Sequence, residues 1–246
     1  MTTASGLGMA ILSEQAPRLA LDLSHEQLAQ FAEYQRLLSE GNRRANLTAI
    51  TEPEAVQVRH FFDSLTAVLA VNEWRDGLRV IDLGTGAGFP GAPLKIVFPG
   101  IHLTLVESTA KKTAFLDTLV ASLGLDNVDV VTARVEELAR TEGYRGQFDV
   151  ALARGVAPMS VLVEYALPLC KGHGTLVAWK GKDGPAETQA ANNALSELGG
   201  RVVGALSMNE LSPPLPPNRW LITVEKVRRT PGKYPRRVGV PAKQPL

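Results

Sequence analysis

Three glycines at alternate positions, Gly84, Gly86 and Gly88, follow a short apolar run that contains Asp82. Glycine lets a backbone turn sharply and approach a ligand closely, so this spacing is typical of a loop that binds a nucleotide or a nucleoside. The motif G-x-G-x-x-G is also met, by Gly86, Gly88 and Gly91, but this match starts late relative to the end of the apolar run. The plain alternative is a tight turn without a ligand. The loop predicts a nucleoside site, and its neighbours indicate the chemistry.

Charge near the loop favours a cationic nucleoside. Asp82 lies two residues before Gly84, where its carboxylate would repel a pyrophosphate by roughly 4 kcal/mol in a partly desolvated cleft. Phe89 occupies the position where a dinucleotide site requires its last glycine. S-adenosylmethionine, which carries ammonium and sulfonium charges, is favoured instead. Its carboxylate could contact the backbone N–H groups of a helix that opens near Pro90. A nicotinamide-dependent oxidoreductase is the less favoured alternative.

Further polar groups follow the next three predicted strands. Glu107 lies 23 positions beyond Gly84, close to the offset of roughly 20 residues at which an acid accepts ribose hydroxyls. Val135 and Glu136 follow the third predicted strand, where a backbone group and a side chain could hold the edge of an adenine. Arg154 ends the fourth strand and is expected to face the same crevice. These residues extend the predicted site from one loop to four strand ends.

No side chain is evident as a general base. Cys170 precedes the fifth predicted strand in an apolar stretch, so it is predicted to be a small buried hydrophobe and not a nucleophile. The four histidines lack metal-ligand spacing, and no metal is expected. A cofactor pocket without a base suits an acceptor with a free lone pair, such as a guanine N7, which attacks a sulfonium methyl without losing a proton. The catalytic side chains stay unassigned.

The elements that must position these groups alternate between strand and helix. Short β-branched runs predict strands at 78–84, 102–108, 128–134, 148–154 and 174–180, followed by two more within 201–211 and 219–227, the last reversed by a short hairpin. Helices are predicted at 109–123, with Gly124 as the C-cap, and near 186–198. This order indicates a parallel doubly wound α/β sheet that binds ligands at the carboxyl ends of its strands.

Helices also precede the first strand. Ser24 and Gln27 fit a capping box at the start of a helix over 24–39, and Thr51 and Glu54 fit a second box. The second helix would carry one apolar stripe, formed by Val58, Phe61, Phe62, Leu65, Val68 and Leu69. We therefore predict a helical cap at 1–75, a Rossmann-like domain at 76–227 and a basic, Pro-rich tail at 228–246.

The charge of the chain is divided unevenly. Seven basic residues and one acidic residue fall within 225–246, so this segment carries a net charge of +6 and the remainder −5. Such asymmetry favours a polyanionic partner, although a basic terminus can also be simply solvated. Prolines would keep the tail extended, and Tyr234 could stack on a base. Other candidates for nucleic-acid contact are Lys111, Lys112, Arg154, Lys180 and Lys182. The absence of a leader and of a long apolar run favours a cytoplasmic protein without a membrane segment.

Several motifs in one order resemble a known family. "NLTAI", "HFFDSL", "DLGTGAGFPG", "ESTAKKTAFL", "ARVEEL", "LARGVAP", "WKGK" and "YPRRVGVPAKQPL" are similar to methyltransferase G of the bacterial small ribosomal subunit, also called glucose-inhibited division protein B. The resemblance runs from about Gly41 to the C-terminus. It implies a class I S-adenosylmethionine-dependent methyltransferase, with a Rossmann-like, seven-stranded, mostly parallel sheet. It also implies that N7 of a guanine in 16S rRNA of the small ribosomal subunit receives the methyl group.

The resemblance also implies cofactor contacts. By position in this sequence they fall on Gly84, Phe89, Glu107, Ser108, Thr109, Val135, Glu136 and Arg154. Asp82 and Gly86 complete the predicted site. The protein is expected to act as a monomer. The remaining alternative is a factor for ribosome assembly that keeps the fold without catalysis.

Overall fold

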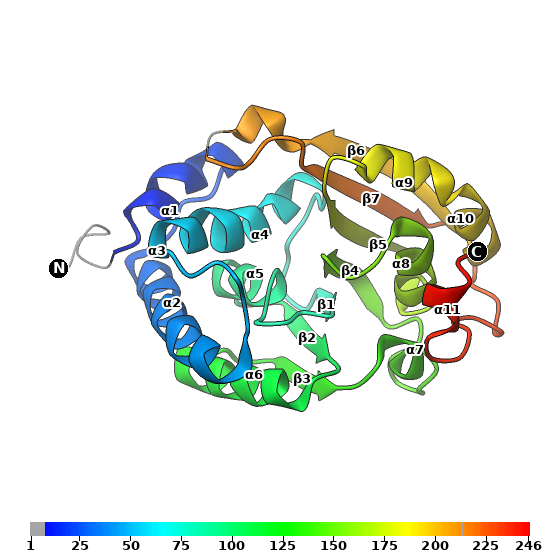
Figure 1. Ribbon diagram of the computed structural model, residues 1–246, viewed down its shortest axis with the longest axis horizontal. Coiled ribbons are helices and arrows are strands. Elements are labelled where there is room, and N and C mark those ends of the chain that lie inside the picture. Colours follow the sequence, from blue (N-terminus) through cyan, green and yellow to red (C-terminus); the bar gives the residue numbers. More distant parts are fainter. Residues whose placement is uncertain (1–7, 213) are drawn as a thin grey trace.

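The structure, a computed structural model, describes residues 8–212 and 214–246 (Figure 1). Its centre is a seven-stranded sheet of order β3-β2-β1-β4-β5-β7-β6, in which β1 to β5 are parallel and β7 is antiparallel to both of its neighbours. The strands are β1 (Arg79–Leu83), β2 (His102–Glu107), β3 (Val128–Thr132), β4 (Phe148–Arg154), β5 (Cys170–Lys180), β6 (Gly200–Ser207) and β7 (Trp220–Lys226). The predicted mostly parallel α/β sheet is confirmed.

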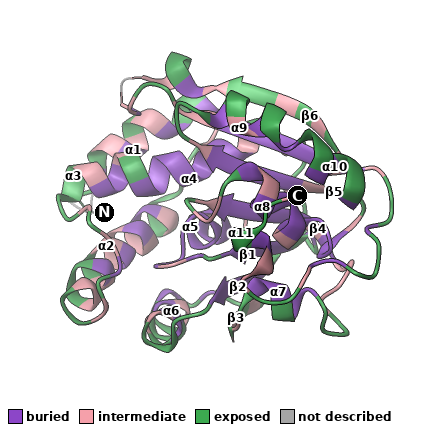
Figure 2. Cartoon of the chain, turned by 45° about the vertical axis from the view of Figure 1, so that its right-hand side comes forward, coloured by how far each residue is buried: buried purple, intermediate pink, exposed green. Residues whose placement is uncertain are grey.

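Helices cover both faces of the sheet, and the strands in the middle are therefore buried on both sides (Figure 2). One face packs on α5 (Gly91–Val97), α6 (Ala110–Leu123) and the N-terminal helices, through strand residues such as Val80, Leu103 and Leu152. The other face packs on α7 (Val135–Leu138), α8 (Met159–Ala166) and α10 (Asn192–Leu198), through Ile81 and Ala151 among others.

Two predicted boundaries in the second half are wrong. The helix expected near 186–198 is two helices, α9 (Gly184–Ala190) and α10, which meet at Ala191. The connection between β6 and β7 spans 208–219 and contains a 3-10 helix at Met208–Leu211, so it is no short hairpin. Prolines such as Pro216 and Pro217 cannot donate to a strand ladder, which keeps this stretch out of the sheet. By contrast, α6 ends at Gly124 in the left-handed conformation, as predicted.

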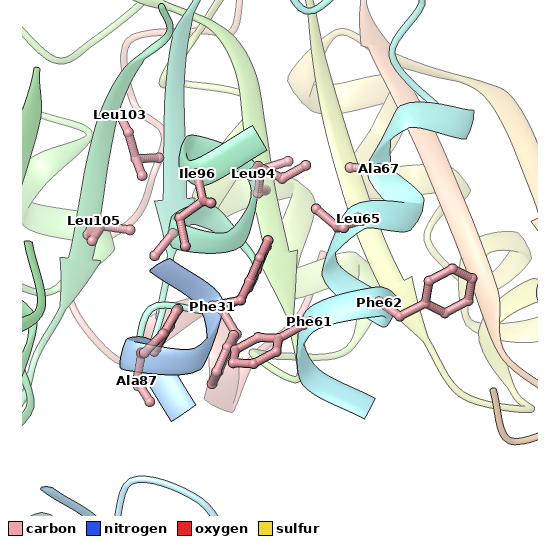
Figure 3. Close-up of a cluster of buried hydrophobic side chains, with 14 of the residues drawn as sticks. Phe31, Phe61, Phe62, Leu65, Ala67, Ala87, Leu94, Ile96, Leu103 and Leu105 are labelled. Atoms are coloured by element: carbon pink, nitrogen blue, oxygen red, sulfur yellow. The ribbon is translucent and has the colours of Figure 1, made fainter. Parts of the chain in front are cut away.

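The N-terminal helices pack directly on the sheet domain. They are α1 (Ala10–Gln15), η1 (Ala16–Leu19), α2 (His25–Ala45), α3 (Pro53–Val56), η2 (Gln57–Phe62), α4 (Asp63–Leu65) and η3 (Thr66–Leu69). Figure 3 shows Phe31 of α2 and Phe61 of η2 among side chains of α5 and β2, and the two rings lie 5.0 Å apart at their centroids. The predicted helical cap therefore shares one hydrophobic cluster with the sheet.

The two predicted capping boxes have different outcomes. Ser24 and Gln27 exchange both hydrogen bonds, of 3.1 and 2.9 Å, at the start of α2. The second box is wrong, because α3 starts at Pro53 with Glu52 as its N-cap and no side-chain cap. The predicted apolar stripe also ends early: the π-helical turn η2 shifts the helical phase, and Leu69 is 43% exposed.

The C-terminal segment, residues 228–246, returns to the body beside α7 and α8 and contains α11 (Val240–Lys243; Figure 1). Arg236 donates to both carboxylate oxygens of the fully buried Glu164, at 2.6 to 3.2 Å. Tyr234 is only 4% exposed, so the predicted stacking of its ring on a base is wrong. Arg145 donates to the Tyr234 carbonyl at 2.7 Å, which explains why the segment does not extend into solvent.

Candidate cofactor site

The glycine loop joins β1 to α5 and uses backbone conformations that other residues rarely adopt. Gly84, Gly86 and Gly88 have φ angles of +63°, +61° and +102°. A Cβ on Gly84 would lie 3.2 Å from a methyl group of Val156. A Cβ on Gly88 would lie 2.6 Å from the Tyr34 hydroxyl. Gly84 thus leaves bare backbone toward the strand ends, while Gly88 allows the N-terminal helices to approach.

Asp82 lies beneath this loop and does not face a ligand. Its carboxylate is fully buried and accepts hydrogen bonds from the Gly91 N–H at 2.8 Å and the Thr85 hydroxyl at 2.6 Å. Burial raises the pKa of this carboxyl from 3.8 to about 7. Both hydrogen bonds go to Oδ2, which shapes the loop, while Oδ1 has no hydrogen-bond partner in the described part of the chain. Because the whole side chain is buried, the expectation that it stands beside the ligand is corrected.

The same contact changes the predicted anion site at the start of α5. The Gly91 N–H is taken by Asp82, and the Ala92 N–H donates to the Gly88 carbonyl at 2.8 Å. These two donors are therefore not free for a ligand carboxylate, contrary to the expectation from Pro90.

A cavity of about 430 Å³ opens at the carboxyl ends of β1, β2, β3 and β4. Its size lies within the roughly 300–1,000 Å³ that is usual for small-molecule sites. Five predicted site residues line it: Gly84, Glu107, Ser108, Val135 and Glu136. The other lining residues are Val106, Ala133, Arg134, Gly155, Val156, Ala157, Pro158, Val161, Tyr165, Ala242 and Pro245. Five other predicted residues are not in this lining: Asp82, Gly86, Phe89, Thr109 and Arg154.

Glu107 ends β2 at this cavity, and its side chain is 8% exposed. One carboxylate oxygen accepts the Thr109 N–H at 2.9 Å, and the other lies 3.9 Å from the Lys112 ammonium. Thr109 therefore orients Glu107 through its backbone. An oriented carboxylate at the end of the second strand has the chemistry needed to accept ribose hydroxyls.

Glu136 ties the C-terminal segment to the cavity. Its Oε1 accepts the Gly239 N–H at 3.0 Å, and Ala242 and Pro245 follow as part of the lining. Tyr165 lies beside Glu136, and burial together with that carboxylate raises its pKa to about 12. Sequence reasoning missed Tyr165 and the C-terminal residues, because their distance along the chain gives no sign of this proximity.

Phe89 and Arg154 face the N-terminal helices. The Phe89 ring is stacked between Tyr34 and His60, with centroid separations of 5.1 and 4.4 Å. The Arg154 guanidinium lies 5.2 Å from the Phe89 centroid and donates to Asp63 at 2.9 Å. Arg154 therefore joins the end of β4 to the helix that contains Asp63, and the expectation that its side chain faces the cofactor crevice is corrected.

The His60 imidazole beside this ion pair is neutral at physiological pH. Burial, followed by the positive charges of Arg154 and Arg59, lowers its pKa to about 3. A guanidinium only donates, so Nδ1 of His60 accepts from Arg154 at 3.2 Å. The proton consequently lies on Nε2 and is donated to the Thr48 hydroxyl at 2.8 Å. The three-residue spacing of His60 and Asp63 on one helix was the available signal for this cluster.

Cys170 is the first residue of β5 and is fully buried, which confirms its prediction as a small core residue. Burial raises the pKa of its thiol to about 12, so little reactive thiolate exists near neutral pH. Within residues 8–212 and 214–246, no group of His, Cys, Asp and Glu side chains has an arrangement that could hold a metal ion. No helix of that same part of the chain has the length and apolar character to cross a membrane.

Comparisons with known proteins agree with this geometry. The model of the family described as rRNA small subunit methyltransferase G matches residues 27–212. The ribosomal RNA small subunit methyltransferase G of Roseiflexus castenholzii is 47% identical over 92% of this chain and 94% of its own, and that of Exiguobacterium sp. is 45% identical over 92% and 93%.

Solved structures share the fold at low sequence identity. A S-adenosylmethionine-dependent methyltransferase from Aquifex aeolicus has a TM-score of 0.53 at 18% identity, covering 77% of this chain and 98% of its own. A protein from Galdieria sulphuraria that is assigned as a sarcosine dimethylglycine methyltransferase has a TM-score of 0.55 at 9% identity, covering 79% of this chain and 98% of its own. These likenesses show a class I methyltransferase fold.

Proposed function

This chain belongs to the rRNA small subunit methyltransferase G family, and from that membership we propose that it methylates N7 of one guanine in 16S rRNA. Membership and fold make it a S-adenosylmethionine-dependent methyltransferase of small-subunit rRNA. The choice of N7 goes further and depends on the chemistry of the cavity.

The cavity fits the cofactor. S-adenosylmethionine supplies a methyl group on a positively charged sulfur. Glu107 would hold the ribose hydroxyls through the oxygen that Thr109 does not occupy. The chain at Val135 and Glu136 would contact the adenine, and the absence of a side chain at Gly84 would leave room for the rest of the cofactor.

The observation that carries the N7 proposal is the lack of a poised base among the described residues of the cavity. Glu107 would be occupied by the Thr109 N–H and the ribose hydroxyls, Glu136 is held by the Gly239 N–H beside Tyr165, and the raised pKa of Tyr165 keeps its hydroxyl protonated. Methylation of an exocyclic amine or a hydroxyl requires a proton to be removed. A guanine N7 already has a free lone pair, so the protein needs only to align it and to keep water away.

The test uses small ribosomal subunits from cells that lack the gene. Purified protein and cofactor with a radiolabelled methyl group should label the RNA, and borohydride followed by aniline should then cleave the labelled RNA at one position, as it does at 7-methylguanosine. If the RNA is labelled but resists cleavage, the methyl group is on another acceptor atom. If the protein binds the cofactor but the RNA stays unlabelled, the alternative of a ribosome-assembly factor without catalysis is favoured.

The proposed substrate places the activity in the cytoplasm, where ribosomal subunits are made. Arg44, Lys111 and Phe115 flank a groove of about 330 Å³ between α2 and α6, and basic and aromatic groups of this kind suit RNA contact. The monomeric state stays a prediction.

A further inference from the structure

A second cavity of about 320 Å³ lies beside the cofactor cavity. Residues 155–158, the loop that follows β4, contribute to the lining of both cavities. The remaining lining comes from β4, α8, β5 and α9: Ala153, Leu162, Trp179, Lys180, Gly181 and Glu187. A molecule in the second cavity would thus contact the same short loop that borders the cofactor cavity.

A lysine–glutamate pair provides the polar groups of this second cavity. The Lys180 ammonium donates to Oε2 of Glu187 and to the Ala157 carbonyl, both at 2.7 Å, and its side chain is only 8% exposed. The Met159 N–H also donates to Oε2, at 3.2 Å. Lys180 is therefore held inside the molecule, so the nucleic-acid contact predicted for it would require a ligand that enters this cavity.

The second oxygen of Glu187 stays available. No group in the described part of the chain donates to its Oε1, and the side chain is 34% exposed. Two donors fix Oε2, so the free oxygen has a defined direction. A carboxylate of this kind accepts hydrogen bonds from a ligand and lies next to a lysine that donates.

We propose that this second cavity receives the acceptor guanine and that Glu187 recognises the edge carrying N1–H and the N2 amino group. This inference rests on the proposed function. Guanine presents two neighbouring donors that Oε1 can accept through its two lone pairs, whereas adenine presents an acceptor at N1 and would leave this oxygen unpaired. Lys180 provides a donor for the adjacent O6, and Trp179 and Leu162 provide apolar walls for a flat ring.

This orientation leaves N7 free to face the cofactor, because N7 lies on the Hoogsteen edge of the purine, separated by O6 from the N1 and N2 edge that Glu187 would hold. Residues 155–158 border both cavities, and N7 would have to reach the methyl group at the edge of this loop. As the lone pair of N7 forms the new bond to carbon, the carbon–sulfur bond breaks and its electrons go to sulfur, which becomes neutral. The base acquires the positive charge and its N1–H becomes more acidic. The hydrogen bond to Glu187 therefore strengthens during the reaction, which favours the transition state.

The test compares Glu187→Gln with the wild type in single-turnover methyl transfer to small subunits with guanine or inosine at the target position. Inosine lacks only the N2 amino group. The wild type should be roughly 10-fold slower on inosine, the effect of one hydrogen bond to a charged group. Glu187→Gln should be at least roughly 10-fold slower on guanine and should lose the preference for guanine over inosine.

Glu142→Gln is the matched control, since Glu142 is exposed and lines neither cavity. It should keep the wild-type rate and the wild-type preference. Calorimetric titration with S-adenosylmethionine should give Glu187→Gln the wild-type affinity, which excludes a folding defect. Independently of any variant, wild-type protein saturated with S-adenosylhomocysteine should bind guanosine monophosphate more tightly than inosine or adenosine monophosphate.

The outcomes separate the two proposals. If the wild type methylates no RNA, the proposed function fails. If it methylates guanine while Glu187→Gln keeps both rate and preference, only the role of Glu187 is overturned. Equal affinities for the guanosine and inosine nucleotides would overturn it as well.

Discussion

Asp82 combines two well-made hydrogen bonds with complete burial, and the burial dominates its protonation. The unfolded chain loses this proton near pH 4, whereas the folded protein keeps it until about pH 7. Between these values a rise in pH favours unfolding, by roughly 1.4 kcal/mol per pH unit. The stability contributed by the protonated group is complete below pH 4 and is lost as the pH passes 7.

Asp82→Asn should remove this pH dependence. Relative to the asparagine variant, the wild type should lose about 3 kcal/mol in free energy of unfolding between pH 5 and pH 8. Urea denaturation of both proteins at the two pH values measures this difference. Parallel pH profiles would show that the folded-state pKa is not raised.

A substitution in the glycine loop separates backbone strain from cofactor contact. Gly84→Ala should lower the free energy of unfolding by about 1–2 kcal/mol, because its φ is left-handed, and should also weaken S-adenosylmethionine binding, because the new methyl group faces the cavity wall at Val156. Gly143→Ala is the control, with a similar φ but open space around it. Calorimetry should show weaker cofactor binding for Gly84→Ala alone, and equal affinities would place the cofactor elsewhere.

At the scale of elements, α2 holds the glycine loop through Tyr34, whose hydroxyl donates to the buried Ala87 carbonyl at 2.7 Å. Tyr34→Phe should keep the ring stacked on Phe89 but leave that carbonyl unsatisfied, with a loss of about 1–3 kcal/mol. Tyr144→Phe is a suitable control, since no hydrogen bond from the Tyr144 hydroxyl exists among the described residues. Urea denaturation measures both changes, and equal stabilities would mean that water replaces the Tyr34 contact.

The order of strands and helices was predictable because the strands in the middle of a parallel sheet are near-continuous apolar runs, such as 150–153 and 176–179. The helical phase over 53–69 could not be predicted, because a π-helical turn has no characteristic amino-acid composition. At the site, Glu107 was found from its offset to Gly84, and Glu136 from its place after the third predicted strand. The buried position of Asp82 could not be predicted, because an aspartate that shapes a loop and an aspartate that faces a ligand occur in the same sequence pattern.

At the scale of the whole molecule, the C-terminal segment depends on one buried ion pair. Arg236→Ala should lower the free energy of unfolding by about 3 kcal/mol, because it leaves the Glu164 carboxylate buried with only the backbone N–H of residue 236 as donor. The neighbouring Arg237→Ala is the control, since that side chain is exposed. Thermal unfolding measures both, and similar melting temperatures would show that the segment is not anchored there.

Net charge alone does not reveal which basic groups of this segment are already paired within the protein. Lys226 donates to the Cys170 carbonyl, and Arg228 donates to the Ser196 carbonyl. Such pairings depend on surfaces from distant parts of the chain and cannot be seen in the tail sequence.

The position of the C-terminal segment has a practical consequence for anyone handling the protein. Pro245 lines the cofactor cavity, and the described residues nearest the two ends lie on opposite sides of the molecule in Figure 1. A purification handle or fluorophore attached after Leu246 would emerge at the cavity mouth and compete for that space. Surface immobilisation for binding measurements is therefore better made through the other end.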